Sequence, residues 1–459
     1  MRARIGTTRF CLEPVTDRDG AIITAVFYGG KILPKKFYQL SREERLQQLV
    51  AEGSLAENDA DYLAANHVLP SAVAAHLGEN QLGQFPLPYG IARTLMVNGV
   101  TRNVAMVGEE PSVVAAASNG ARMALAGGGV QVAVPEHTVT GEVVFADVAD
   151  PDAAVALISS REDDIWDAAA YAHPSIIGRG GGLKQVQVQA IGQFVKIRLV
   201  IDPQAAMGAN MVNTIAEAVA HMVGQWLHQE ALLAILSNYT DDPVVATVAI
   251  PVAAVATKSL PGSVVAARIA AASAFGFIDE ERATTNNKGI MNGIEAATIA
   301  LGNDYRAVST AVHAYAAQSG AYQPLTRWTT DGKMLHGQLR VPLQLGVVGG
   351  ATAALPLAQI AMRLGKIATV ADAQAVLAAL GLVQNLAALR ALVGPGIQSG
   401  HMALQAGALA IAAGATGTEI DALTHLLQTT DKTIGRAKEL LAQLRADKQS
   451  EENDNEDRD

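Results

Sequence analysis

The most informative candidate catalytic residue in the sequence is a lysine that stands among asparagines and glycines. Lys288 stands in the stretch NNKGIMNG (Asn286–Gly293), and Arg282 precedes it by six residues. We expect this stretch to be a loop between two helices, where a lysine has little use in packing. Its ammonium group could stabilise a developing oxyanion, and the arginine could hold a carboxylate through two parallel hydrogen bonds. An ordinary surface loop explains the segment equally well.

Three further candidates stand where helices should begin. Glu110 precedes Pro111, Asp304 precedes Tyr305 in the segment GNDYR, and His401 follows a glycine. An acid at such a position often only caps the helix or complements its dipole. A carboxyl or imidazole group beside a reacting carbonyl could instead give or take a proton, although a single histidine is more often structural. The residue types alone do not decide between these roles.

Two segments could contact a nucleotide. Met207–Asn210 follows a strand that ends at Asp202, and small residues at a helix start offer unpaired N–H groups to an anion; a plain helix start explains it equally well. The glycine cluster Gly178–Gly182 lacks the dinucleotide fingerprint. A helix rather than a strand precedes it, strands follow, and Leu183 stands where a third glycine is needed. We therefore exclude a Rossmann site.

No metal site is expected. His221 and His228 are seven residues apart on one helix, whereas metal ligands usually stand three or four apart with a third ligand nearby. Cys11 is the only cysteine, which excludes a disulfide framework and a cysteine-ligated metal or iron–sulfur site. A reducing compartment is the natural environment for such a chain.

Composition limits the classes of function. The chain has 459 residues, of which 17% are charged, against about 25% in a typical soluble domain. This shortage of charge indicates two or three domains or large buried subunit contacts. The net charge of −10 argues against nucleic acid or an anionic membrane as partner. Half of it lies in the tail Glu451–Asp459, which we expect to be solvated and disordered.

Hydropathy gives no sign of a membrane anchor. The most apolar run, Val244–Ala256, is interrupted by Pro251 and is shorter than the about 20 residues that a spanning helix needs. The arginines near the N-terminus are not followed by an apolar core, as they would be in a signal peptide. We expect a cytoplasmic protein.

The elements that must position the candidates predict an α+β protein. Residues 136–244 follow the order β-α-β-β-α-β of the ferredoxin-like fold and interrupt a large, mainly helical domain formed by residues 35–135 and 245–399. Residues 1–34 form an extension of uncertain order, residues 400–448 a C-terminal helical unit, and residues 449–459 the acidic tail. Inserted strands are expected at Glu142–Val148 and Val244–Ile250, and large-domain helices at Glu295–Leu301, Val370–Leu380 and Val383–Val393. A capping box at Ser41–Glu44 should begin the first helix of the large domain. Asp331-Gly332 should form the turn of a hairpin over Trp328–Pro342.

Five motifs occur together in an order and spacing that identify a family. They are EEPS at Glu109–Ser112, AMGAN at Ala206–Asn210, NKGIMNG at Asn287–Gly293, GND at Gly302–Asp304 and GHM at Gly400–Met402. With them the chain resembles the class II hydroxymethylglutaryl-CoA (HMG-CoA) reductases, the soluble bacterial type, over roughly Lys35–Lys448.

The resemblance implies a reaction and an architecture. It implies reduction of HMG-CoA to mevalonate and CoA, through mevaldehyde, by two hydrides from NADPH or NADH. The same residues would serve synthesis and breakdown of mevalonate. The fold would be a large helical domain, an inserted NAD(P)-binding domain without a Rossmann motif, and a mobile C-terminal flap. Family members are homodimers or larger homo-oligomers with active sites shared between subunits, and they use no metal.

The resemblance also assigns roles to residues. Lys288 would stabilise the oxyanion, Glu110 would donate a proton to the mevaldehyde oxygen, and Asp304 would join both in one network, which needs a carboxyl with a raised pKa. His401, on the flap, would protonate the departing CoA thiolate. The matched substrate-binding positions are Ser112, Arg282, Thr285, Asn292 and Asn238, and the matched nucleotide-binding positions are Met207, Gly208, Ala209, Asn210 and Asn213.

The sequence bears on the choice of nucleotide. NADH-preferring relatives can carry an acid for the ribose hydroxyl where Pro174 stands here, with His173, Arg179 and Lys184 nearby. Without an acid the 2′-phosphate of NADPH is not repelled, so we expect NADPH or dual use, with NADPH favoured.

Two other classes of function remain to be weighed. A catalytically silent CoA-ester or nucleotide-binding homologue would not need Glu110, Lys288, Asp304 and His401 together. A two-electron dehydrogenase of a small hydroxy acid conflicts with the missing Rossmann fingerprint. Counting hydrides per CoA released separates all three.

Overall fold

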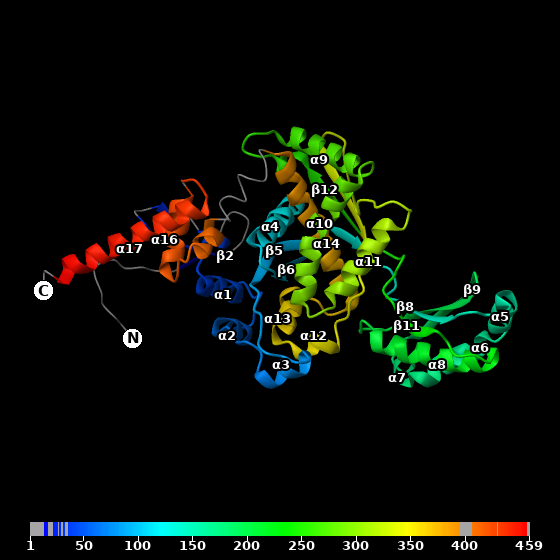
Figure 1. The fold of residues 1–459 in the computed structure, drawn as a ribbon. Coiled ribbons are helices and arrows are strands. Elements are labelled where there is room, and N and C mark those ends of the chain that lie inside the picture. Colours follow the sequence, from blue (N-terminus) through cyan, green and yellow to red (C-terminus); the bar gives the residue numbers. More distant parts are fainter. Residues whose placement is uncertain are drawn as a thin grey trace.

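The computed structural model describes residues 35–394, 406–428 and 430–456 and four short strands before them. These strands are β1 (Glu13–Thr16), β2 (Ile22–Ala25), β3 (Phe27–Tyr28) and β4 (Lys31–Ile32). Cys11 and His401 lie outside the described residues. The described chain forms three units, each with its own hydrophobic core. The large unit lies between the small domain and the C-terminal unit (Figure 1).

Two long helices form the centre of the large unit. They are α10 (Glu280–Ala300) and α14 (Val370–Val393). Within the described residues α14 alone is a single unbroken helix long and apolar enough to cross a membrane, but 72% of its apolar window is buried inside the protein. Gly381 lets the two helices pack closely, since a Cβ there would lie 2.8 Å from the side chain of Ile294. The two predicted helices Val370–Leu380 and Val383–Val393 are therefore one, and the expected break at Gly381 is a point of close packing.

An antiparallel sheet and a hairpin complete this unit. The sheet has the order β13 (Thr326–Thr330), β14 (Met334–Val341), β12 (Val244–Pro251) and β7 (Gln131–Ala133). Helices α4 (Pro111–Leu125), α9 (Gly262–Gly276) and α14 pack against it. The hairpin joins β5 (Tyr89–Val97) and β6 (Val100–Val107) and was not predicted. The turn at Asp331-Gly332 between β13 and β14 is confirmed, because Asp331 accepts hydrogen bonds from the N–H groups of Lys333 and Met334.

Short elements surround the large unit. Helix α1 (Arg42–Ala51) begins with the predicted capping box, in which Ser41 and Glu44 each accept the other's backbone N–H. The remaining elements are η1 (Phe37–Gln39), α2 (Glu57–Ala65), α3 (Ser71–Leu77), η2 (Val252–Val255), α11 (Tyr305–Ala317), α12 (Gly350–Ala354) and α13 (Pro356–Leu364).

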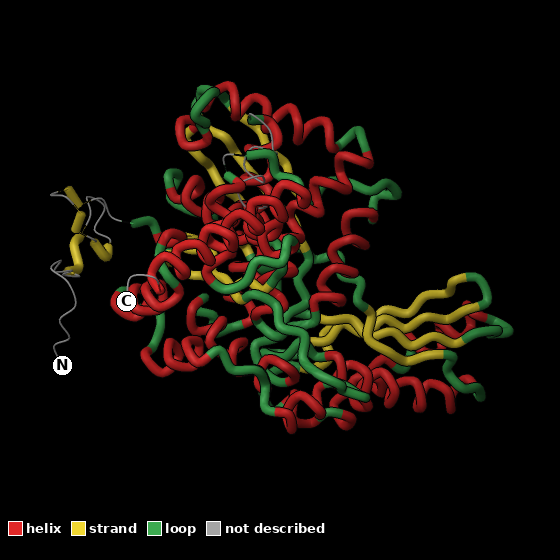
Figure 2. The backbone as a smooth tube through the Cα atoms, turned by 60° about the vertical axis from the view of Figure 1, so that its left-hand side comes forward, coloured by secondary structure: helices red, strands yellow, loops and turns green. Residues whose placement is uncertain are grey.

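The small domain is a four-stranded antiparallel sheet with helices on one face (Figure 2). Its strands are β8 (Val139–Phe145), β9 (Gly182–Ile191), β10 (Phe194–Asp202) and β11 (Leu233–Ser237), and its helices are α5 (Pro151–Ser159), α6 (Glu162–Ala172), α7 (Pro174–Ile177) and α8 (Ala209–Leu227). The spatial order β11-β8-β10-β9 is fourth, first, third and second in the chain. This is the arrangement of the ferredoxin-like fold.

The last strand of that pattern was assigned wrongly. Val244–Ile250 does not close the small sheet; as β12 it pairs with β14 and β7 in the large unit. The small sheet is closed by β11, a short edge strand that pairs with β8. Alternation of buried residues predicts that a segment is a strand but not which sheet it joins.

The C-terminal unit lies on the side of the large unit away from the small domain (Figure 1). It contains α16 (Thr418–Leu427) and α17 (Ile434–Glu456), joined by two hydrogen bonds between Arg445 and Glu419. The acidic tail was expected to be disordered, but α17 continues to Glu456. Glutamate favours helix, so an acidic run can extend one that is already formed.

Candidate active site

Lys288 lies inside a helix and not in a loop. Helix α10 has 21 residues and begins at Asp279, whose side chain accepts the N–H of Arg282 at 2.6 Å. The predicted loop and the separate helix Glu295–Leu301 are therefore wrong. The glycines that suggested a loop lie against neighbouring helices: a Cβ at Gly293 would be 3.2 Å from the side chain of Gln384.

The candidates on α10 share one face. At about 100° per residue, Arg282, Thr285, Lys288 and Asn292 fall within about 120° of arc. Thr285 and Lys288 are exposed, and Arg282 and Asn292 are half-buried. The residues on the opposite side, such as Asn287 and Ile290, are fully buried. One helix therefore presents a basic, hydroxyl and amide surface that the described residues leave largely uncovered.

A buried polar network fixes the rotation of α10. Asn286 donates to Thr326 on β13 at 2.9 Å and accepts from Asn385 on α14 at 2.9 Å. Asn385 in turn accepts from Thr326 at 3.0 Å and from the indole of Trp328 at 2.8 Å. Because every member is paired, the network holds α10 in one orientation and so holds Lys288 outward. Sequence analysis did not single out Asn385, which follows Gln384 in a mainly apolar helix.

Arg282 is suited to a carboxylate. Burial lowers the pKa of its guanidinium, an effect that the nearby Asp279 opposes. Among the described residues, its buried Nε has no hydrogen-bond partner. A buried, unpaired guanidinium N–H is stabilised by an anionic ligand that accepts from it.

Glu110 precedes the first turn of α4. Pro111 occupies the first helical position, and the hydroxyl of Ser112 donates to the Glu110 carboxylate. The structure therefore brings together the predicted proton donor and one predicted substrate-binding residue.

Asp304 caps α11. Its carboxylate accepts the N–H groups of Arg306 at 2.9 Å and Ala307 at 3.2 Å, and it pairs with the Arg306 guanidinium at 3.2 Å. Partial burial acts to raise the pKa of Asp304, but these hydrogen bonds and the charge of Arg306 outweigh it and lower the pKa. The raised pKa expected for a catalytic carboxyl is not found at Asp304.

Lys288 and Asp304 are not brought together within one chain. Lys288 lies twelve residues before the end of α10 at Ala300, which is about 18 Å along the helix axis. This is farther than a lysine side chain reaches, and Asp304 follows only beyond that end. In the part of the chain that the structure describes, Lys288 makes no ion pair.

The nucleotide candidates lie at the start of α8. Gly208 has φ +97° and is the N-cap, so the first N–H groups of the helix receive no side-chain cap. Ala209 and Met207 are half-buried, and Asn210 is exposed.

The two asparagines assigned near this helix differ in their contacts. Asn213 accepts the N–H of Leu236 at 2.8 Å, which ties α8 to β11. Its side-chain oxygen is therefore engaged within the fold. Asn238, half-buried, directly follows β11.

The segment around the predicted 2′-phosphate position, residues 173–184, contains no acid, but two acids from elsewhere in the chain lie beside Lys184. Lys184 is already paired with Glu136 at 3.1 Å and Asp202 at 3.6 Å, which raises its pKa. Arg179 is exposed, and His173 contacts the hydroxyl of Ser175 at 3.3 Å. Arg179 is therefore the better placed of the two cations to meet a phosphate.

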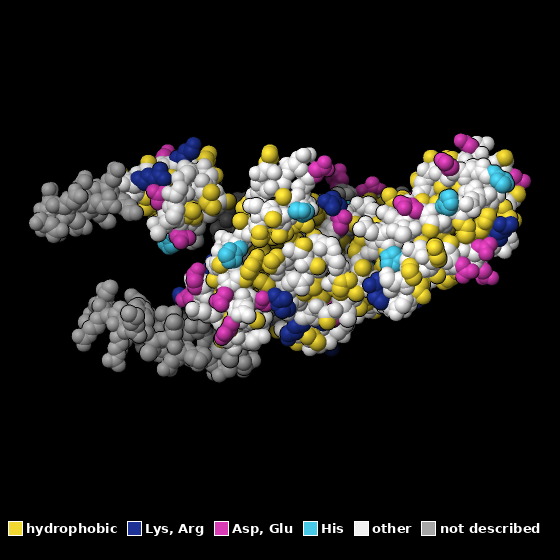
Figure 3. All heavy atoms as spheres, turned by 90° about the horizontal axis from the view of Figure 1, so that it is seen from below, with side chains coloured by type: hydrophobic (Ala, Val, Ile, Leu, Met, Phe, Trp, Pro, Cys, Tyr) yellow, Lys and Arg dark blue, Asp and Glu magenta, His cyan; other side chains and the backbone are white. Residues whose placement is uncertain are grey.

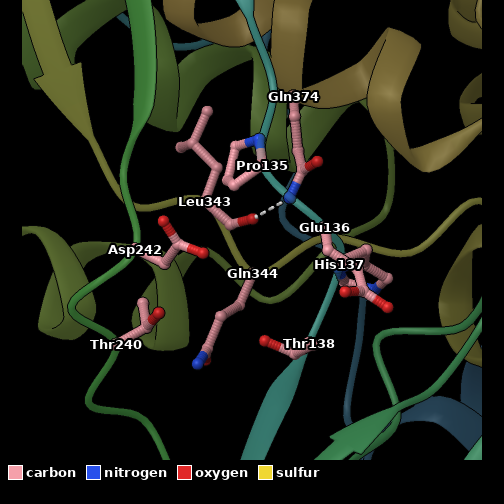
Figure 4. A pocket seen from close by; sticks show the side chains of 9 residues that line it. All are labelled: Pro135, Glu136, His137, Thr138, Thr240, Asp242, Leu343, Gln344 and Gln374. Atoms are coloured by element: carbon pink, nitrogen blue, oxygen red, sulfur yellow. Dashed lines mark hydrogen bonds between the residues drawn. The ribbon is translucent and has the colours of Figure 1, made fainter. Parts of the chain in front are cut away.

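Two hollows do not coincide with these residues. A cavity of about 10 Å³ lies where the chain passes between the large unit and the small domain, lined by Glu136, His137, Asp242, Gln344 and others (Figure 4). It has room for about one water and not for a substrate. A hollow of about 500 Å³ lies on the four-stranded sheet of the large unit, and none of the candidate residues lines it.

Comparison with known proteins identifies the family. The family model described as hydroxymethylglutaryl-coenzyme A reductase matches residues 41–406. The 3-hydroxy-3-methylglutaryl-coenzyme A reductase of Archaeoglobus fulgidus is 40% identical over 416 residues, covering 89% of this chain and 94% of the relative. A probable reductase of Borreliella burgdorferi is 31% identical over 407 residues, covering 86% and 88%.

Solved structures agree with this result. The class II reductase of Streptococcus pneumoniae, bound to NADPH in open conformations, is 37% identical, with a TM-score of 0.75, covering 88% of this chain and 100% of that one. A second structure from the same organism has a TM-score of 0.76. The chain therefore belongs to the HMG-CoA reductase family, in its class II.

Proposed function

We propose that Glu110, Lys288, Asp304 and His401 carry out the four-electron reduction of HMG-CoA to mevalonate and CoA in this chain. The observation that supports this most is the uncovered face of α10, on which Arg282, Thr285, Lys288 and Asn292 stand at helical spacing. Such a face can hold a carboxylate and a hydroxyl at one end while an ammonium group meets the reacting carbonyl.

The start of α8 fits a dinucleotide. A glycine N-cap without a side chain leaves backbone N–H groups and the positive end of the helix dipole available to a phosphate. Met207, Gly208, Ala209 and Asn210 would hold the nucleotide there. When bound, its nicotinamide supplies the two hydrides.

The residues of the chain would then act in sequence. Arg282 would pair with the free carboxylate of HMG, and Ser112, Thr285 and Asn292 would orient the substrate. Lys288 would stabilise the oxyanion that forms at the thioester carbon. Collapse of that oxyanion breaks the C–S bond and gives mevaldehyde, and His401 would protonate the departing thiolate. Lys288 would then polarise the aldehyde, and Glu110 would give the proton that completes mevalonate.

The nucleotide is proposed to be NADPH. The related Streptococcus pneumoniae enzyme is described with NADPH bound, and residues 173–184 contain no acid that would repel a 2′-phosphate. We expect a higher kcat/KM with NADPH than with NADH, and Arg179→Ala should reduce that ratio. A higher kcat/KM with NADH would overturn the assignment.

The active site is proposed to be completed by a second copy of the chain. Lys288 and Asp304 are too far apart within one copy, and the catalytic face of α10 is uncovered. Leu82 and Phe85 are also 102% and 88% exposed. Seen from below, hydrophobic side chains gather over the middle of the molecule (Figure 3). Covering such apolar surface favours association, so we infer a homodimer or larger homo-oligomer.

We propose that the protein is located in the cytoplasm. The single cysteine fits a reducing compartment. Fractionation of the native host with antibodies against this chain should find it with cytosolic markers, and recovery with membranes would contradict the proposal.

Counting hydrides tests the reaction. Purified protein with HMG-CoA and NADPH should oxidise two nucleotides for each CoA released, measured by absorbance and by a thiol reagent. No oxidation would indicate a silent binding homologue. One nucleotide per turnover, with no CoA released, would indicate an ordinary dehydrogenase.

A further inference from the structure

Asn303 clasps a peptide group that comes from a distant part of the chain. Its Nδ2 donates to the carbonyl of Gly346 at 3.0 Å, and the N–H of Gly346 donates to its Oδ1 at 2.8 Å. Asn303 directly precedes Asp304, so this two-bond amide clasp fixes the position of the loop that carries Asp304. Such a pair of bonds defines both the distance and the orientation of the two segments.

The clasped segment in turn contacts the approach to α8. A Cβ on Gly346 would lie only 2.4 Å from the backbone nitrogen of Met207, so the two backbones touch. The next residue, Val347, donates its N–H to the carbonyl of Ala205 at 2.9 Å. Ala206 and Val348 then form a parallel bridge. Only this short segment separates Asn303 from the start of the nucleotide helix.

We propose that Asn303 is a positioning residue, which sets the spacing between the Asp304 loop of the large unit and the α8 start of the small domain. The inference rests on the proposed roles of Asp304 and α8. Hydride transfer requires the nucleotide and the substrate-side residues at a defined separation, and a displacement of about 1 Å can cost about a hundredfold in rate. The clasp, the glycine contact and the bridge form one continuous connection between the two groups.

The chain contains a matched control for this clasp. Asn98 donates to the carbonyl of Val132 at 3.0 Å and accepts the N–H of Val132 at 2.7 Å. The two clasps have the same chemistry and lie in the same protein, but the second touches none of the candidate site residues. Asn98 has φ +48°, so Asn98→Ala adds backbone strain that Asn303→Ala does not. A merely structural role therefore predicts no larger loss of activity for Asn303→Ala than for Asn98→Ala.

The experiment compares Asn303→Ala with Asn98→Ala in the full-length protein. Three quantities are measured: kcat with HMG-CoA and NADPH, the Kd for NADPH from its fluorescence, and Tm. We expect kcat of Asn303→Ala to be at least tenfold below that of Asn98→Ala, with the Kd for NADPH within threefold of wild type and a loss in Tm no larger than that of Asn98→Ala. If kcat of the two variants agrees within threefold, or if lost NADPH binding accounts for the whole difference, the inference is wrong.

A second variant keeps the test independent of the folding of Asn303→Ala. Gly346→Ala retains Asn303 but places a methyl group against Met207, and it should lower kcat by a similar factor. Gly78→Ala, where a Cβ meets nothing within 4 Å, is its control. Turnover of Gly346→Ala equal to that of Gly78→Ala would contradict the inference.

The role of Asp304 and the positioning role of Asn303 can be tested separately. If Asp304→Asn keeps full turnover, the role of Asp304 is wrong whatever Asn303 does. A loss in Asp304→Asn together with equal activity of the two asparagine clasp variants rejects the positioning role alone.

Discussion

The two faces of α10 differ in what they contact and in what they can do. One face, with Asn286, Asn287 and Ile290, is buried against β13 and α14 and is paired throughout. The other face, with Lys288 and Thr285, is exposed, and Lys288 forms no ion pair with the described residues. The same helix thus separates residues that hold the fold from residues available for chemistry.

This difference predicts that stability and activity can be changed separately on one helix. Substitutions on the buried face should lower the free energy of unfolding and leave the chemistry of the remaining folded protein nearly intact. Substitutions on the uncovered face should do the reverse.

Lys288→Met should have the largest effect on activity. Loss of a single oxyanion donor lowers kcat by about 10²–10³-fold, or about 3–4 kcal/mol in activation free energy. Because Lys288 is exposed, Tm should stay within about 1 °C of wild type. Lys333→Met, another exposed lysine of the large unit, is the control and should change neither quantity. A kcat of Lys288→Met within threefold of the control would remove the lysine from the mechanism.

Ile290→Ala should have the largest effect on stability. Ile290 of α10 is fully buried and packs against Gly381 of α14. Removal of such a side chain lowers the free energy of unfolding by about 3 kcal/mol, through lost burial and the cavity left behind. Urea unfolding measures this loss. At temperatures where the variant is folded, kcat should stay within about fivefold of wild type. A stability equal to wild type would show that the two helices are not packed as described.

Asn385→Ala should lower the free energy of unfolding by about 2 kcal/mol. It leaves the indole N–H of Trp328 and the hydroxyl of Thr326 without their buried acceptor. Since the network also sets the rotation of α10, we expect a smaller additional loss in kcat, about threefold to tenfold. Unchanged unfolding in urea would mean that the network does not fix the helix.

Asp304→Ala should have a smaller effect on stability than Ile290→Ala and Asn385→Ala, and that effect should depend on pH. Loss of an N-cap lowers the free energy of unfolding by about 1 kcal/mol. The loss is smaller at Asp304, because its side chain is 40% exposed and solvent screens its charge. The pKa of Asp304 is lowered from 3.8, so its contribution is fully present above that value and is lost as the pH falls through the lower folded pKa. The difference in unfolding free energy between wild type and variant should therefore shrink between about pH 5 and pH 3. A difference independent of pH would contradict the cap.

Local signals made part of the fold predictable. The capping box at Ser41, the proline that begins α4 and the Asp331-Gly332 turn each depend on neighbouring residues, and all three are confirmed. The order of the first five elements of the small domain was also predictable from the alternation of apolar residues, but its last strand was not. On the uncovered face of α10, residue types singled out Lys288 and Arg282, and only the resemblance added Thr285 and Asn292.

The features that were not predicted from the sequence depend on tertiary contacts. Asparagine and glycine have low helix propensity, so Asn286–Gly293 was expected to be a loop. Packing against α14 and the paired asparagines outweigh that propensity. In the same way β12 joined the sheet of the large unit, because sheet membership depends on partners distant in the sequence. Neither the clasp of Asn303 nor the network of Asn385 has a local signal.

Mixing two inactive variants tests most directly that the uncovered face of α10 works with a carboxyl from a second copy. Lys288→Ala and Asp304→Ala are each expected to be nearly inactive as separate proteins. When the two variants are mixed in equal amounts, dissociated and reassembled, half of the dimers should contain one protomer of each variant. In each mixed dimer, one of the two active sites should have both wild-type residues. We expect recovery of about a quarter of wild-type activity per protomer. Activity no higher than that of the separate variants would contradict it.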